Sequence, residues 1–235
     1  LFKQPQGNSV QNKLITIALL TTALAAHAET FPMTNLPQGW TGSINVAQCA
    51  EGKCAGKGEV RLTLGKQTHT LPADFHEFSA PKAQGAAPLV NPITIDDFNF
   101  VGKDDVAVPR GHQGPYGSAS YDIYVQTADG KLVRNADLTD LTDNYMGLPE
   151  TDAKRKLLIV YGKSGAAIHY TEHYRPSAKG LQNVYSRVDT HDGCGADKVK
   201  IAEKALLPNG KWRSKNRCLS DAQYSKLIER ETAKR

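Results

Sequence analysis

The chain has 235 residues, of which 40% are hydrophobic and 23% are charged, and its formal net charge is +5 at pH 7. This length is enough for one or two domains with an apolar core. The mild positive charge excludes an obvious nucleic-acid footprint, because the densest basic stretch, 211–217, is interrupted by Trp212, Ser214 and Asn216. We therefore expect no nucleic-acid partner.

The first 28 residues have the pattern of a secretory signal peptide. Lys13 precedes the apolar run 14–26, and Ala26-His27-Ala28 fits a cleavage site after Ala28. Residues 1–9 lack signal character and form an N-terminal extension ahead of the pattern. The apolar run is too short to span a bilayer and no second run of about 20 residues follows, so we expect no stable membrane insertion. The sequence predicts a soluble periplasmic protein.

Four cysteines in an exported protein are typical of two disulfides. The simplest of the three pairings joins Cys49 to Cys54 across a hairpin tip and Cys194 to Cys218 around a second hairpin. The sequence does not distinguish this pairing from the other two. Zinc is the rival interpretation, but these spacings are poor for a zinc site.

Short alternating stretches between turn signals predict a mainly β protein. We expect an antiparallel β-sandwich or propeller-like meander with a short C-terminal helix at 220–230, where Ser220 is an N-cap candidate. The predicted parts are a signal peptide (1–28), an N-terminal β segment (29–80), a connection (80–92) and a β-rich domain (93–235). The expected strands are 44–47, 59–64, 68–71, 93–95, 106–108, 121–126, 132–134, 157–161, 167–174, 181–188 and 199–205.

Residues 97–105 form an acidic loop between two expected strands. Asp97, Asn99 and Asp105 alternate with other residues, and Gly102 permits a sharp bend. Such oxygen ligands in a short loop are typical of a Ca²⁺ site. Val101 stands where a further side-chain oxygen is expected, which weakens the site. Calcium is the one cofactor that the sequence indicates.

The segment His169-Tyr-Thr-Glu172-His173 fits the H-x-x-E-H signature of a zinc protease. That chemistry needs a helix, in which residues i and i+4 share one metal ion. The segment is instead expected to be a strand, where positions i and i+4 lie about 13 Å apart. A metal-dependent hydrolase built on these three residues stays the alternative to a non-catalytic protein.

The loop 111–121 is rich in glycine and carries Tyr116 between Pro115 and Gly117. Loops that combine tyrosine with serine and glycine are suited to inserting into a partner's cleft. We expect Tyr116 to be exposed and Tyr121 to pack inward at the start of a strand.

The order of three motifs resembles a known family. They are D-x-N-x-V-G-x-x-D from Asp97, G-x-Y-G-x-x-S-Y-D-x-Y from Gly114, and S-G-A followed by H-Y-T-E-x-Y-R from Ser164. Together they resemble periplasmic calcium-binding immunity proteins that inhibit peptidoglycan hydrolases delivered by type IV secretion systems. That family is related to periplasmic inhibitors of invertebrate-type lysozyme. The resemblance covers about 93–188.

The resemblance implies a secreted protein, not an enzyme, that blocks a lysozyme-like hydrolase by placing loops in its cleft. It implies cation ligands at Asp97, Asn99 and Asp105. It also implies partner contacts in two loops, at Tyr116, Ser118, Ser164 and Gly165. A calcium-stabilised adhesion or binding module is the third alternative.

Overall fold

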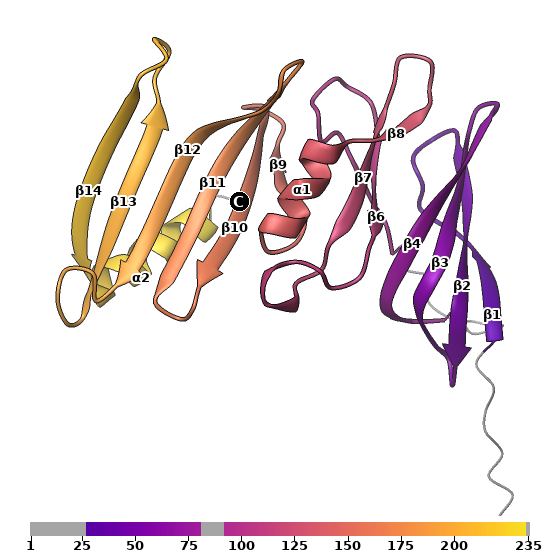
Figure 1. Ribbon diagram of the computed structural model, residues 1–235, viewed down its shortest axis with the longest axis horizontal. Coiled ribbons are helices and arrows are strands. Elements are labelled where there is room, and N and C mark those ends of the chain that lie inside the picture. The colour runs from indigo at the N-terminus through magenta and orange to yellow at the C-terminus, as the bar shows by residue number, and fades with distance from the viewer. Residues whose placement is uncertain (1–26, 81–91, 234–235) are drawn as a thin grey trace, which may run out of the picture.

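Three antiparallel sheets follow one another along the chain and stand side by side in space (Figure 1). The computed structural model describes residues 27–80 and 92–233, so the apolar run of the predicted signal peptide and most of the predicted connection lie outside it. Within the described residues the prediction of a mainly β protein with a short C-terminal helix is confirmed.

Each strand pairs with its neighbours in sequence, so every sheet is a meander. The first sheet holds β1 (His27–Pro32), β2 (Trp40–Ala50), β3 (Lys53–Leu64) and β4 (Gln67–Ser79). The second holds β5 (Thr94–Asp96), β6 (Asp105–Pro109), β7 (Tyr121–Gln126) and β8 (Leu132–Arg134). The third holds β9 (Glu150–Asp152), β10 (Leu157–Ser164), β11 (Ile168–Ser177), β12 (Gly180–His191), β13 (Lys198–Leu206) and β14 (Trp212–Ser220).

Strand β6 lies between two apolar cores, and all five of its residues are buried. Its side chains alternate in direction, as in any strand. Val106 and Val108 therefore enter the core of the first sheet, while Ala107 enters a second core with Ile123 and Leu158. β6 therefore joins the packing of the first sheet to that of the third.

Helix α1 (Ala136–Asn144) was not expected from the sequence. Its asparagine, aspartate and threonine residues are poor helix formers. It forms because Asn135 caps its N-terminus and because its leucines, Leu138 and Leu141, enter the second core. The hydroxyl of Thr139 also accepts the backbone N–H of Ile123 at 3.0 Å. Tertiary contacts thus override weak local propensity.

Every expected strand overlaps an observed one, but β1, β9 and β14 were missed. Strand β14 is exposed along most of its length and carries polar residues on both faces. It therefore lacks the apolar alternation by which strands are recognised in a sequence. The strand is instead held by its pairing with β13, which extends over nine residue pairs.

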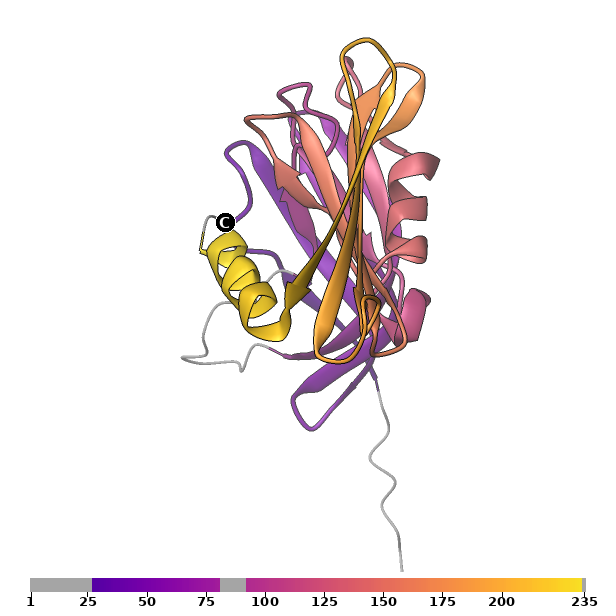
Figure 2. The same cartoon turned by 90° about the vertical axis from the view of Figure 1, so that its left-hand side faces the viewer.

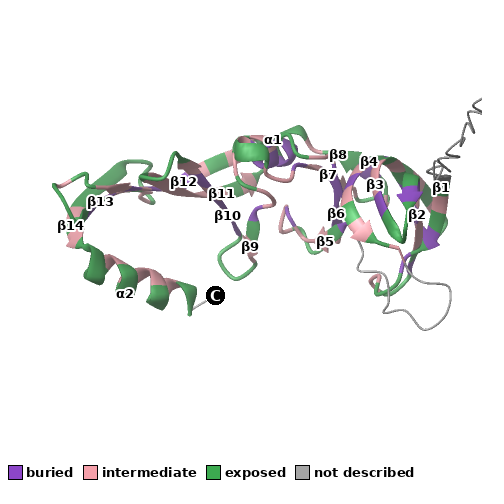
Figure 3. Ribbon diagram, turned by 90° about the horizontal axis from the view of Figure 1, so that it is seen from below, coloured by how far each residue is buried: buried purple, intermediate pink, exposed green. Residues whose placement is uncertain are grey.

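The C-terminal helix α2 (Asp221–Thr232) begins with a capping box between Ser220 and Gln223. Figure 2 shows α1 and α2 on opposite faces of the sheets. Arg187 holds α2 in place, since it pairs with Asp189 at 2.7 Å and with Glu231 at 2.8 Å. A groove of about 1050 Å³ is lined mainly by residues 148–155 and by β10, β11 and β12, and α2 contributes only Glu231 to it. Figure 3 shows α2 and α1 on opposite sides of the third sheet. Neither described helix is long and apolar enough to cross a membrane.

The two disulfides follow the simplest pairing. Cys49–Cys54 joins β2 to β3 at the tip of their hairpin. Cys194–Cys218 ties the loop between β12 and β13 to β14. Both pairings are confirmed, and zinc ligation by these cysteines is thereby excluded.

The buried hydroxyl of Thr139 offers a test of how α1 is held. Thr139→Val keeps the shape of the side chain and leaves the backbone N–H of Ile123 without its acceptor. We expect the free energy of unfolding, measured by urea denaturation, to fall by roughly 1–3 kcal/mol. Thr232→Val, at an exposed site in α2, is the control and should change it by less than about 0.5 kcal/mol. Equal effects of the two substitutions would contradict this role.

Candidate functional site

The loop between β6 and β7 contains a tight turn that presents Tyr116. The turn spans Pro115–Gly117, and the backbone N–H of Ser118 donates to the carbonyl of Pro115 at 3.1 Å. Tyr116 adopts a positive φ of 57°, which is uncommon for a residue with a side chain. The residue is 62% exposed. The structure thus holds an aromatic ring out from the surface.

Tyr116 meets the turn between β10 and β11. The backbone N–H of Gly165 donates to the Tyr116 hydroxyl oxygen at 2.5 Å. The Nζ atom of Lys163 lies 4.7 Å from the centre of the Tyr116 ring, which is a cation–π contact. We call Tyr116, Lys163, Ser164 and Gly165 the Tyr116 ridge. Two loops that the sequence indicated separately therefore form one surface feature.

Ser118, the fourth predicted partner contact, is not part of the Tyr116 ridge. It is half-buried, and its hydroxyl donates to the carbonyl of Tyr145 at 3.4 Å. Ser164 and Gly165, by contrast, are exposed at the tip of their hairpin. Of the four predicted partner contacts, the structure places three on the outer surface and one beneath it.

Two histidines support the Tyr116 turn, His112 from the same loop and His76 from β4 of the first sheet. His112 Nδ1 lies 3.0 Å from the carbonyl oxygen of Gly117, which can only accept, so this nitrogen donates. Its Nε2 then accepts from Nδ1 of His76 in β4 at 2.8 Å. Burial lowers the pKa of His76 below its ordinary 6.5, and the neighbouring His112 lowers it further, while Asp74 opposes the shift.

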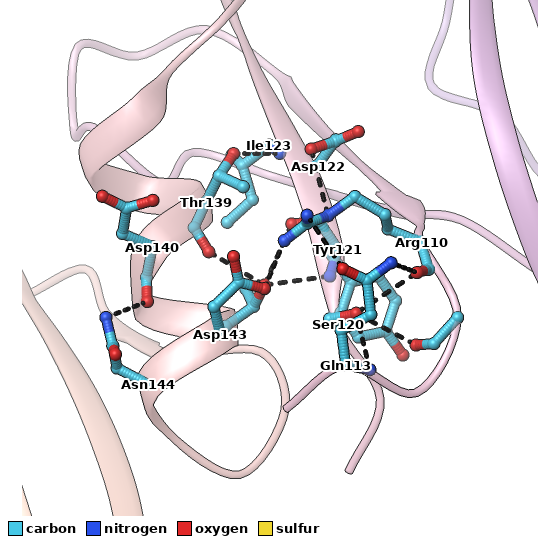
Figure 4. Close-up of polar contacts among 12 residues, drawn as sticks. Arg110, Gln113, Ser120, Tyr121, Asp122, Ile123, Thr139, Asp140, Asp143 and Asn144 are labelled. Atoms are coloured by element: carbon cyan, nitrogen blue, oxygen red, sulfur yellow. Dashed lines mark hydrogen bonds and ion pairs between the residues drawn. The ribbon is translucent and has the colours of Figure 1, made fainter. Parts of the chain in front are cut away.

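Arg110 anchors the base of the same loop (Figure 4). Its guanidinium pairs with Asp143 of α1 and lies 3.3 Å from a carboxylate oxygen of Asp122 in β7. Its backbone N–H donates to the carbonyl of Ser120 at 2.8 Å, which closes the loop. Charge and backbone bonds thus hold both ends of the loop on the second sheet.

The acidic loop lies at the other end of β6. The carboxylate of Asp97 accepts the backbone N–H of Val101 at 3.0 Å and that of Gly102 at 2.8 Å. The side-chain oxygen of Asn99 accepts from Val101 at 3.1 Å. The predicted cation ligands Asp97 and Asn99 therefore use their side-chain oxygens to accept hydrogen bonds from the backbone of the loop.

Asp105 is fully buried at the start of β6. Its carboxylate accepts the backbone N–H of Gln126 at 2.9 Å and that of Asn99 at 3.2 Å. Burial raises the pKa of Asp105 to about 6, and the charge of Asp97 adds to the rise, although the hydrogen bonds oppose it. A buried acid beside a second acid is an environment that a bound cation would relieve.

The side-chain oxygens of this loop are the type of ligand that a hard cation prefers, but they are too few to complete its coordination shell. Asp97, Asn99 and Asp105 all offer oxygen, the ligand that Ca²⁺ prefers. Val101 is 62% exposed and offers none from its side chain. In the described part of the chain, no three carboxylate, histidine or cysteine ligand atoms of this loop lie within 4.8 Å of one another. Backbone carbonyls and water would have to complete the shell.

The H-x-x-E-H segment does not form a metal site. It lies in β11, so the helix that the zinc signature requires is absent from it. Neighbouring side chains of a strand point to opposite faces, which separates Glu172 from His169 and His173. Glu172 accepts from the hydroxyls of Tyr145 and Tyr174 at 2.8 Å and 2.7 Å. These side chains cannot share one ion, and the metal-dependent hydrolase alternative is wrong.

Sequence reasoning missed the residues that support the ridge. Lys163 directly precedes Ser164-Gly165, so its place beside that turn was visible in the sequence. His76 and Asp143 gave no such signal, because each reaches the Tyr116 loop from another element. Their contributions depend on how the first sheet and α1 pack against the second sheet.

The depressed pKa of His76 predicts a pH dependence. The folded state binds a proton on His76 less readily than the unfolded state, so stability is lost as the pH falls below about 6.5. His76→Asn keeps an N–H near the place of Nδ1 but does not titrate. We expect it to lose less stability than the parent between about pH 8 and pH 5, measured by urea denaturation at each pH. His69→Asn in the same strand is the control, and parallel curves for the parent and His76→Asn would contradict the assignment.

Comparison with known proteins identifies one structural likeness. A solved structure described as a Xanthomonas type IV secretion system related protein has a TM-score of 0.56 to this chain at 19% identity. The match covers 79% of this chain and 92% of that one. No protein-family model matches the chain, and no curated protein matches its sequence. The likeness shows a shared fold.

Proposed function

We propose that the protein is a non-catalytic periplasmic inhibitor that blocks the cleft of a peptidoglycan hydrolase with the Tyr116 ridge. The observation that carries this proposal is the hydrogen bond from the Gly165 N–H to the Tyr116 oxygen. Because that oxygen accepts from Gly165, the hydroxyl proton of Tyr116 is left to donate outward. The ridge thus offers a fixed donor on an exposed ring.

The electrostatics of the ridge suit a carboxylate. Enzymes that cleave glycosidic bonds use a pair of carboxyl groups in their cleft. Lys163 brings a positive charge next to the Tyr116 ring and makes no ion pair within residues 27–80 and 92–233. A donated hydrogen bond and a nearby ammonium group would together bind an ionised catalytic carboxyl. The bound inhibitor would also displace the glycan chain.

The support of the ridge favours tight binding. Association costs less free energy when the binding loop is already ordered. The His112 bond to Gly117, the Arg110 ion pairs and the Gly165 bond each restrain the Tyr116 turn before a partner arrives. A loop held from three elements behaves as a preformed plug.

Two further observations support the cellular setting. The structural neighbour is described as related to a type IV secretion system, which fits a role against hydrolases delivered by such systems. Two disulfides fit an oxidising compartment such as the periplasm. Both agree with the secretory signal that the sequence predicts.

The inhibitor role is tested by lysis of cell-wall suspensions. The parent, without its signal peptide, should slow clearing by at least one of a panel of hydrolases that includes invertebrate-type lysozyme and enzymes delivered by type IV secretion systems. Tyr116→Phe keeps the ring but removes the donor, and we expect at least about tenfold weaker inhibition. Tyr161→Phe is the matched control in β10, where the hydroxyl instead donates to Glu150. If the parent slows no hydrolase, the proposal fails.

We propose calcium as the ion of the acidic loop, where it would neutralise Asp97 and Asp105 and hold the start of β6. Isothermal titration at millimolar Ca²⁺ should give measurable binding heat, which Asp97→Ala should abolish. Val101→Asp restores the expected oxygen and should tighten binding by about tenfold or more. Asp140→Ala, an exposed acid on α1, is the control. A flat trace for the parent would remove calcium from this loop and leave the inhibitor role standing.

A further inference from the structure

The hairpin of β13 and β14 concentrates the positive charge of the molecule. Between 198 and 218 the chain carries seven lysine and arginine residues and a single acid, Glu203, although the whole chain has a net charge of only +5. Arg217 pairs with Glu203 at 3.4 Å, and this is the one ion pair of the hairpin in the described structure. This end of the third sheet is therefore strongly electropositive.

The basic side chains fall on two faces of the hairpin, and the faces differ. Strand alternation places Lys200 and Lys204 on one face and Arg213 and Lys215 on the other. Residues that pair directly across antiparallel strands have their side chains on the same face. Lys204 pairs with Ser214, and two residues further along Leu206 pairs with Trp212, so Trp212 shares the face of Lys204. Trp212 is 46% exposed, an unusual exposure for so large an apolar ring.

A pocket of about 430 Å³ opens on that face. Trp212 forms one wall, and the other lining residues are polar: Asn183, Ser186, Lys204 and Ser214. Ser186, Lys204 and Ser214 stand in one cross-strand row, so three neighbouring strands contribute to the lining of the pocket. The size falls within the range of small-ligand sites, which combine an apolar surface with a few convergent polar groups.

Several polar groups of the pocket lack partners in the described part of the chain. The side chains of Lys204 and Ser214 make no hydrogen bond or ion pair there. The Oδ1 atom of Asn183 is buried without a hydrogen-bond partner, while its Nδ2 donates to Glu172 at 2.6 Å. The free polar groups that the pocket itself presents are therefore the Lys204 ammonium group and the Ser214 hydroxyl.

We propose that this pocket binds a saccharide that carries a carboxylate. One face of a sugar ring is made of C–H groups and packs on the exposed Trp212 ring, as amphipathic ligands do on aromatic side chains. Its hydroxyls reach Ser186 and Ser214. The carboxylate pairs with the Lys204 ammonium group, and the net positive charge of the hairpin attracts an acidic chain from a distance.

The pocket is separate from the Tyr116 ridge. The turn between β13 and β14, beside Trp212, and the turn between β10 and β11 lie at opposite ends of the third sheet (Figure 1). Saccharide binding is therefore independent of the proposed inhibitor role, and either can fail without the other. A protein that carries both would hold itself on an acidic glycan while its ridge stays free.

The test is a titration followed by tryptophan fluorescence. The chain has two tryptophans, and Trp40 is buried, so a ligand-dependent signal reports on Trp212. The probes are tetragalacturonate and the disaccharide of N-acetylglucosamine and N-acetylmuramic acid, which separate an acidic polysaccharide from a cell-wall source. The neutral probe is the N-acetylglucosamine tetramer. We expect saturable binding of at least one acidic probe and at least about tenfold weaker binding of the neutral one.

Variants decide whether the pocket or the charge alone is responsible. Lys204→Ala should weaken binding of the acidic probe by about tenfold or more. Lys215→Ala removes the same charge from the opposite face of the hairpin and should weaken it by less than about threefold. Trp212→Phe, followed by calorimetry, should also weaken binding, with an unchanged urea midpoint as evidence of folding. Equal losses for Lys204→Ala and Lys215→Ala, or no saturable binding of either acidic probe, would overturn the proposal.

Discussion

Burial of β6 on both faces is the constraint on which the rest of the structure depends. Its valines pack with the first sheet and its alanine packs with α1 and the third sheet, so the strand cannot shift without disturbing both cores. The strand starts at Asp105, in the acidic loop, and ends next to Arg110, at the base of the Tyr116 loop. Rigid packing in the middle thus sets the position of both functional candidates.

The Tyr116 ridge depends on contacts that are long-range in sequence. The composition of the loop 111–121 marks Tyr116 as a contact candidate, and the family resemblance adds Ser164 and Gly165. Their meeting depends on the second and third sheets standing side by side, which no local pattern encodes. The inward position of Ser118 has the same cause, because the carbonyl of Tyr145 that it contacts comes from the end of α1.

Local patterns predicted most of the strands but missed β1, β9 and β14. The zinc signature was judged correctly as a strand because residues 168–174 are rich in aromatic and branched side chains. Helix α1 was missed because its stability comes from packing, from the Asn135 cap and from threonine hydroxyls that replace a strand partner of β7. Strand β14 was missed because its exposed faces have no alternation, yet that exposure creates the basic face around Trp212.

The central claim is that Tyr116 donates to the catalytic carboxyl of a hydrolase, and a double-mutant cycle tests it most directly. The affinities of parent and Tyr116→Phe inhibitor would be measured against an inhibited hydrolase and against its variant with the catalytic glutamate changed to glutamine. A direct hydrogen bond to that charge predicts a coupling free energy of about 1 kcal/mol or more. Additive losses, with no coupling, would show that Tyr116 binds elsewhere and would contradict the plug mechanism.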